Sequence, residues 1–129
     1  MATDHAILIV EDNDVNLMVL RSLLRKKGYE PLVAKDGLEG LEMALAYHPR
    51  LILMDLNMPR MDGFASAAEI RRQLPGHDII IVAVTANVTD EQVRACNEAG
   101  FAGLLPKPLD FMELSATVRK WAGDPRPAA

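Results

Sequence analysis

Short apolar segments alternate with amphipathic segments along most of the chain, and this alternation restricts the possible folds more than any other feature. Four of the five apolar segments show no alternation with polar residues, which is typical of strands buried on both faces of a sheet. We therefore predict buried strands at Ile7–Val10, Pro31–Ala34, Leu51–Met54, Ile79–Val84 and Ala102–Leu105.

The segments between these strands carry apolar residues at intervals of three or four, as the buried face of a helix does. The clearest sets are Leu17, Leu20 and Leu24; Leu38, Leu41 and Leu45; and Phe111, Leu114, Val118 and Trp121. Three helix starts have an N-cap residue followed three residues later by Glu or Gln. These are Asp36 with Glu39, Thr89 with Gln92, and Asp110 with Glu113. Helix ends are marked by Gly28, Pro49, Pro75 and Gly100.

Strict alternation of strand and helix predicts an α/β fold with a parallel sheet, because right-handed crossovers place each helix over a face of the sheet. Five repeats favour a flavodoxin-like, doubly wound (βα)5 sandwich with strand order 2-1-3-4-5, whose ligands bind at the carboxyl edge of the sheet. A chain of 129 residues suits one domain. We expect that domain at residues 1–122 and a flexible tail at 123–129.

Composition argues against several classes of protein. The net charge of −4 leaves no basic field for direct nucleic-acid binding. The single cysteine, Cys96, cannot form an internal disulfide and lies in an apolar helical context, which fits a reducing compartment. No apolar stretch is long enough for a membrane span, and the first residues lack the features of a signal peptide. We therefore expect a cytoplasmic protein.

Polar residues follow four of the predicted strands at the edge where a ligand is expected. Glu11 and Asp12 follow the first strand, Asp55 the third, Thr85 the fourth and Lys107 the fifth. Clustered carboxylates repel one another and cannot all ionise without a cation, and one lysine offsets only part of this repulsion. Because the donor atoms are hard oxygens, we predict a site for Mg²⁺ or Mn²⁺.

A carboxylate beside such a cation can attack phosphorus and form an aspartyl phosphate, while a hydroxyl and an ammonium group stabilise the transferred charge. Each residue alone has a simpler interpretation. Asp12 or Asp14 could cap the first helix, Thr85 could be a turn hydroxyl and Lys107 a solvated charge. Their joint position favours phosphoryl chemistry. We assign no chemistry to His5, His48 and His77, and interpret Met18, Met43, Met54, Met58 and Met61 mostly as packing residues.

Four motifs resemble the signatures of response-regulator receiver domains. They are residues 10–16 (Val-Glu-Asp-Asn-Asp-Val-Asn), 53–63 (Leu-Met-Asp-Leu-Asn-Met-Pro-Arg-Met-Asp-Gly), 84–87 (Val-Thr-Ala-Asn) and 106–108 (Pro-Lys-Pro). The resemblance extends over about residues 7–121. The first motif is similar to those of receivers in hybrid sensor kinases and phosphorelays.

The resemblance implies that Asp55 accepts a phosphoryl group from a histidine kinase or a histidine phosphotransfer protein. It implies direct metal contacts from Asp12, Asp55 and the backbone carbonyl of Asn57, and a contact from Glu11 through water.

The remaining site residues follow from the same resemblance. Thr85, the backbone amide of Ala86, and Lys107 would bind the phosphoryl oxygens, and the Lys107–Pro108 peptide bond would be cis. Slow hydrolysis of the aspartyl phosphate would occur with Asn57 and Asn87 near the path of the water.

One position departs from the family pattern. Three residues before the lysine, receivers usually carry a Tyr or Phe that moves inward with the threonine, and this chain has Leu104. The resemblance places a partner surface on residues 89–121, but the route by which phosphorylation would reach it is open.

Three alternative functions share some of these features. A receiver-like interaction module that is never phosphorylated would account for Leu104, although the complete acidic site favours phosphorylation. A flavin-binding flavodoxin would need a glycine- or hydroxyl-rich loop after the first strand. An aspartyl phosphatase would carry a second acid where this chain has Asn57.

Overall fold

A computed structural model describes residues 7–58 and 60–124 of the chain. Its strands are β1 (Ile7–Val10), β2 (Leu32–Ala34), β3 (Leu51–Asp55), β4 (Ile80–Thr85) and β5 (Gly103–Pro106). Its helices are α1 (Asp14–Lys26), α2 (Gly37–Tyr47), α3 (Gly63–Gln73), α4 (Asp90–Glu98) and α5 (Phe111–Ala122). All strands are parallel and follow the order β2-β1-β3-β4-β5. The flavodoxin-like fold is therefore confirmed. Most of the predicted tail, residues 125–129, lies outside the described residues.

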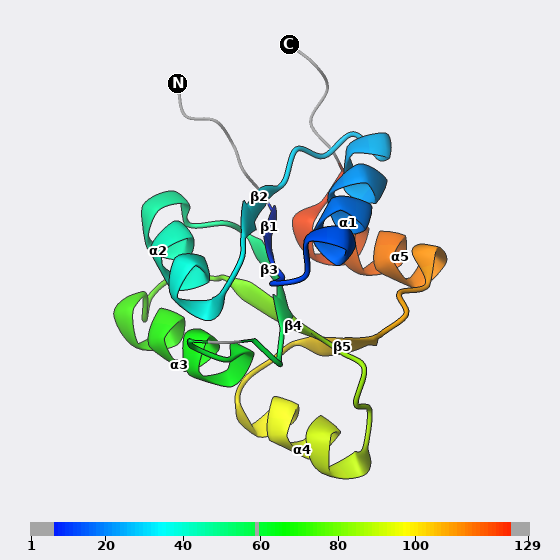
Figure 1. The fold of residues 1–129 in the computed structure, drawn as a ribbon. Coiled ribbons are helices and arrows are strands. Elements are labelled where there is room, and N and C mark those ends of the chain that lie inside the picture. The colour runs from blue at the N-terminus through cyan, green and yellow to red at the C-terminus, as the bar shows by residue number, and fades with distance from the viewer. Residues whose placement is uncertain (1–6, 59, 125–129) are drawn as a thin grey trace.

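The sheet forms the middle layer of three (Figure 1). Helices α1 and α5 cover one face, and α2, α3 and α4 cover the other. Strand β1 shows why no polar alternation is seen in the sequence. Ile7 and Ile9 pack into the core under α1 and α5, whereas Leu8 and Val10 pack into the core on the opposite face. Within the described segments, no helix is long and apolar enough to cross a membrane.

Helix starts follow the predicted caps in three cases. The side chains of Asp36, Thr89 and Asp110 accept hydrogen bonds from the backbone N–H groups of Glu39, Gln92 and Glu113. The first helix differs from the prediction, because neither Asp12 nor Asp14 is its cap. Asn13 takes that position, and its Oδ1 accepts a 2.9 Å hydrogen bond from the N–H of Asn16.

The buried face of α2 also differs from the prediction. Leu38 is 37% exposed, and the buried residues of the helix are Gly37, Gly40, Leu41 and Ala44. The helix lies so close to β1 that a Cβ atom on Gly40 would stand 2.9 Å from a methyl group of Val10. Small residues therefore face the sheet together with Leu41, whereas Leu38 is displaced toward solvent. Phe111, predicted to be buried, is 40% exposed at the start of α5.

Candidate functional site

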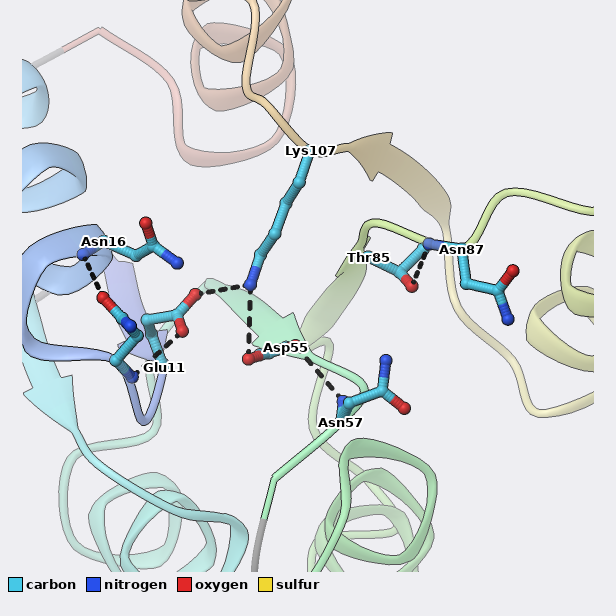
Figure 2. A network of polar contacts seen from close by, with 8 residues as sticks. Glu11, Asn16, Asp55, Asn57, Thr85, Asn87 and Lys107 are labelled. Carbon is cyan, nitrogen blue, oxygen red and sulfur yellow. Dashed lines mark hydrogen bonds and ion pairs between the residues drawn. The ribbon is translucent and has the colours of Figure 1, made fainter.

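The polar residues predicted to form a site meet at the carboxyl edge of the sheet. The register pairs Val10 with Met54 and Thr85 with Pro106. Glu11 therefore leaves β1 beside Asp55 at the end of β3, and Lys107 leaves β5 beside Thr85. Figure 2 shows the Lys107 side chain extending from its strand toward Glu11 and Asp55.

Lys107 forms ion pairs with two buried carboxylates. Its Nζ lies 3.0 Å from Oε1 of Glu11 and 3.4 Å from Oδ2 of Asp55. Glu11 is 1% exposed and Asp55 is 4% exposed. Two carboxylates and a single ammonium leave a net negative charge in a region of low dielectric, so a further cation would be stabilised here.

Burial raises the pKa of the Asp55 carboxyl group to about 6, and the nearby charge of Glu11 adds to this effect. The N–H of Asn57, 3.2 Å from Asp55 Oδ1, acts in the opposite direction, as does the Lys107 ammonium. For Lys107, partial burial works to lower the pKa, but the contacts with Glu11 and Asp55 outweigh it, and the pKa is raised. The lysine therefore remains charged at neutral pH.

The acidic residues suit a divalent metal. One oxygen each from Glu11, Asp12 and Asp55 can be chosen so that all three lie within 4.8 Å of one another. Within the described segments, the buried Oε1 of Glu11 has no well-directed hydrogen bond, although the Lys107 ammonium is near. Asp12 is exposed and leaves the site open to water. An open set of oxygen donors fits Mg²⁺, which usually keeps several water ligands.

Among the described residues, the Thr85 hydroxyl has a hydrogen bond with Asn87 and none with the acidic group. The Thr85 hydroxyl is buried and accepts a 3.1 Å hydrogen bond from the N–H of Asn87 (Figure 2). Its backbone carbonyl accepts a 2.9 Å hydrogen bond from the N–H of Lys107. The peptide bond between Lys107 and Pro108 is cis, as the family resemblance implied. Leu104 is half-buried and pairs with Ala83 in the register of β4 and β5.

A groove of about 490 Å³ adjoins the acidic group. It is lined by Glu11, Asn16, Val19, Leu20, Leu23, Ala86, Lys107, Pro108 and Leu109. Val19 of α1 lines this groove and is 48% exposed, and two more apolar residues of the same helix face solvent: Val15 is 63% exposed and Met18 60%. The interpretation of Met18 as a packing residue was therefore wrong. The spacing of these three residues could have predicted a second apolar stripe on α1, beside the buried one.

Comparisons with known proteins agree with this fold. The family model "Response regulator receiver domain" matches residues 7–119. The polar-differentiation response regulator DivK of Brucella ovis is 30% identical over 119 residues, which are 92% of this chain and 97% of DivK.

Two solved structures are similar over nearly the whole chain. The receiver domain of the sensor histidine kinase PA1611 from Pseudomonas aeruginosa, with magnesium in its active-site cleft, has a TM-score of 0.84 and 35% identity over 95% of this chain and 100% of that one. The receiver domain of Saccharomyces cerevisiae Ssk1, crystallised with the phosphotransfer protein Ypd1, has a TM-score of 0.86 and 30% identity over 95% and 91% of the two chains.

Proposed function

The chain belongs to the response regulator receiver family of two-component signalling, and from this premise we propose that it accepts a phosphoryl group on Asp55 and then regulates a protein partner. The observation that carries this proposal is the position of the Asp55 carboxylate. It is buried at the end of β3, lies 3.4 Å from the Lys107 ammonium, and belongs to a group of three acids. Receivers act as signalling modules, and the only reactions proposed here are those of the chain's own aspartate.

In the proposed reaction, an oxygen of Asp55 attacks the phosphorus of a phosphohistidine. An O–P bond forms, the P–N bond breaks, and the donor imidazole keeps the electron pair. The attacking carboxylate must be ionised. A pKa of about 6 for Asp55 leaves most of the group ionised at neutral pH, with a higher basicity than that of an ordinary aspartate.

We propose that Mg²⁺ or Mn²⁺ is held by Asp12, Asp55 and the backbone carbonyl of Asn57, with Glu11 acting through water. The bound cation supplies positive charge against the repulsion between the incoming phosphoryl group and the carboxylates. The three-acid group and the magnesium ion in the similar PA1611 receiver support this assignment.

Lys107, Thr85 and the backbone amide of Ala86 are proposed to bind the phosphoryl oxygens. Lys107 already lies beside Asp55. Thr85 would have to turn its hydroxyl away from the N–H of Asn87, to which it is now hydrogen-bonded. We further propose slow hydrolysis of the aspartyl phosphate, with Asn57 and Asn87 near the path of the attacking water.

The phosphodonor is proposed to be a histidine kinase or a histidine phosphotransfer protein that docks on the groove beside α1. The groove reaches Glu11, Lys107 and Val19, and the same helix carries the exposed apolar residues Val15 and Met18. An apolar patch next to a reactive group is typical of a protein contact surface. The co-crystal of the similar Ssk1 receiver with Ypd1 supports a donor of this class.

The downstream partner is proposed to bind the α4-β5-α5 face. Leu104 on β5 stands where receivers usually carry an aromatic residue, so the movement of Thr85 would reach this face without the usual switch. We also propose a cytoplasmic location without direct nucleic-acid binding. The buried free thiol of Cys96 and the net charge of −4 support these two proposals.

The test is to treat the chain and its Asp55→Asn variant with acetyl phosphate, with and without Mg²⁺, and to record the intact mass. We expect one added phosphoryl group that requires Mg²⁺ and is absent from the variant. If the chain gains no mass even with a kinase supplied, a phosphorylation-independent interaction module becomes the better description. Leu104 is the feature that favours that second candidate.

A further inference from the structure

Two histidines lie side by side at the amino edge of the sheet, opposite the acidic site. The register pairs Leu51 of β3 with Ile80 of β4. His48 precedes Leu51 by three residues, and His77 precedes Ile80 by three residues. The parallel pairing of the two strands therefore brings residues 29 positions apart together, and their ring centroids are 4.4 Å apart.

Both imidazole rings are exposed, and among the described residues neither forms a polar contact that holds the fold together. Their backbone N–H groups donate to Ala44 and Leu74, but within residues 7–58 and 60–124 neither ring has a hydrogen bond or ion pair. His48 is held in the left-handed conformation, with φ 47°, as the C-cap of α2. The backbone of the helix end therefore sets the position from which its side chain extends.

The geometry of the pair suits a shared metal ion. A metal bound through a ring nitrogen lies in the plane of that ring, so one metal can bind two rings only where their planes cross. The two planes are inclined at 64° and therefore cross, whereas the planes of parallel stacked rings would not.

The distance between the rings indicates the type of metal. With a metal–nitrogen bond of about 2.0 Å, the centre of a bound imidazole is roughly 3.2 Å from the metal. A metal bound equally to two rings whose centres are 4.4 Å apart would see them at about 90°, which is the angle between neighbouring ligands in tetragonal Ni²⁺ or Cu²⁺ sites. A tetrahedral Zn²⁺ site would need the rings farther apart.

We propose that His48 and His77 form a binding site for a late transition-metal cation of the Ni²⁺ or Cu²⁺ type. Imidazole nitrogen prefers these cations, and the oxygen-rich acidic site at the other edge prefers Mg²⁺. Within the described parts of the chain, the only cluster of three or more such ligands is the acidic one. Water therefore completes the coordination of the proposed site, which does not depend on phosphorylation.

The experiment adds NiCl₂ to the full chain and follows the imidazole proton signals by NMR, with binding measured by calorimetry. The chain has three histidines, so single variants assign every signal. Because Ni²⁺ is paramagnetic, we expect the signals of His48 and His77 to broaden first, at substoichiometric metal. His48→Asn and His77→Asn should each weaken Ni²⁺ binding at least about tenfold, and asparagine tolerates the left-handed backbone at position 48.

His5→Asn is the matched control and should bind Ni²⁺ with the affinity of the unsubstituted chain. Excess MgCl₂ should leave the two imidazole signals sharp. Wild-type affinity in either His48→Asn or His77→Asn would overturn the proposal, and so would a loss of binding confined to His5→Asn.

Discussion

Asp55 carries a negative charge in surroundings that disfavour it. The ordinary pKa of the group is 3.8, and burial together with Glu11 raises it to about 6 in the folded chain. Between these two values the folded chain keeps a proton that the unfolded chain has released, so the free energy of unfolding falls as the pH rises through this window. A shift of this size contributes about 3 kcal/mol to the free energy of unfolding at low pH. This contribution is lost once the pH is above the pKa of the folded chain.

Replacing Asp55 with Asn should therefore stabilise the metal-free protein in a pH-dependent manner. We expect the free energy of unfolding of Asp55→Asn to exceed that of the unsubstituted chain by a margin that grows by about 3 kcal/mol between pH 4 and pH 7. Urea denaturation in EDTA across this range measures the margin. Asp78→Asn, at an exposed position, is the control. A margin independent of pH would contradict the assignment of the raised pKa to Asp55.

Lys107 should stabilise the fold because its ammonium group pairs with two buried carboxylates. Its ammonium lies 3.0 Å from Glu11 and 3.4 Å from Asp55, and Lys107→Gln would leave both acids buried without a cation. Breaking a buried pair in this way costs several kcal/mol, and we expect about 2 kcal/mol for this partly exposed lysine at neutral pH without metal.

A double-mutant cycle tests this prediction, because the cost of Lys107→Gln should shrink when Asp55 is already Asn. Lys35→Gln is the matched control. Lys35 also forms a short ion pair, 2.6 Å from Asp14, but both side chains are more than half exposed. That substitution should change stability by less than about 1 kcal/mol. Equal costs for the two lysines would show that burial of the carboxylates is unimportant.

Helix α3 and strand β3 meet at Gly63, just behind the proposed phosphoacceptor Asp55. A Cβ atom at this position would collide with the backbone carbonyl oxygen of Asp55 and lie 2.9 Å from the Cα of Leu56. Neither backbone atom can move without shifting the end of β3. Gly63→Ala should therefore lower the free energy of unfolding by about 2 kcal/mol or more and reduce labelling by acetyl phosphate.

The control for this contact is Gly76→Ala, because an added Cβ at Gly76 would have no atom within 4 Å. Chemical denaturation and intact-mass labelling of both variants provide the comparison. The prediction fails if Gly63→Ala is as stable as Gly76→Ala and is labelled equally well. That result would show that α3 and β3 can move apart without loss of stability.

The outward face of α1 is proposed to bind the phosphodonor, and Met18 is a suitable position to test it. Its side chain is 60% exposed beside the groove, so Met18→Glu should leave the fold intact while placing a charge in the contact. We expect transfer from a phosphorylated phosphotransfer protein such as Ypd1 to slow about tenfold, equivalent to roughly 1.4 kcal/mol. Labelling by acetyl phosphate, which needs no docking surface, should not change.

Met112→Glu serves as the comparison, because Met112 is a methionine of similar exposure, 76%, that lies on α5 rather than on α1. Transfer rates measured by loss of label from the donor distinguish the two variants. Equal slowing by both substitutions would indicate a general effect of charge, and no slowing by Met18→Glu would place the donor on another surface.

Local sequence patterns predicted the elements well where burial alone decides them. Each strand begins and ends within one residue of its expected limits, because a run of apolar residues buried on two faces has few alternatives. The patterns failed where the distance between two packed elements decides which residues are buried. Helix α2 approaches β1 through Gly40, and hydrophobicity does not reveal that a glycine faces the sheet. The α1 cap is Asn13, whose N–H also donates to Glu11, a choice among neighbouring cap residues that sequence leaves open.

At the scale of the molecule, the order of the strands made most of the acidic site predictable. Residues that follow parallel strands converge at one edge, so the positions of Glu11, Asp55, Thr85 and Lys107 directly after predicted strands were enough to group them. Side-chain pairing was not predictable in the same way, since the closer partner of Lys107 is Glu11 rather than Asp55. The meeting of His48 with His77 depends on the register between β3 and β4, which no local pattern encodes.

The acidic site is joined to α4 by a short loop whose conformation depends on Thr85. In this structure the Thr85 hydroxyl accepts a hydrogen bond from the N–H of Asn87, and α4 begins with its cap at Thr89. If the hydroxyl turns to a phosphoryl oxygen on Asp55, the Asn87 N–H loses this partner. Because residues 86–89 are exposed, the change can pass along the backbone into α4 without a large side chain at position 104.

Phosphorylation should therefore speed hydrogen exchange at the Asn87 amide and alter exchange across residues 86–98, whereas β1 and α1 should change little. Exchange measured by NMR with and without acetyl phosphate and Mg²⁺ tests this, with Asp55→Asn as the unphosphorylated control. Thr85→Ala can still be phosphorylated but lacks the hydroxyl, so its Asn87 amide should exchange at one rate in both states. A response of Thr85→Ala equal to that of the unsubstituted chain would mean that the signal leaves the site by a route that does not include Thr85.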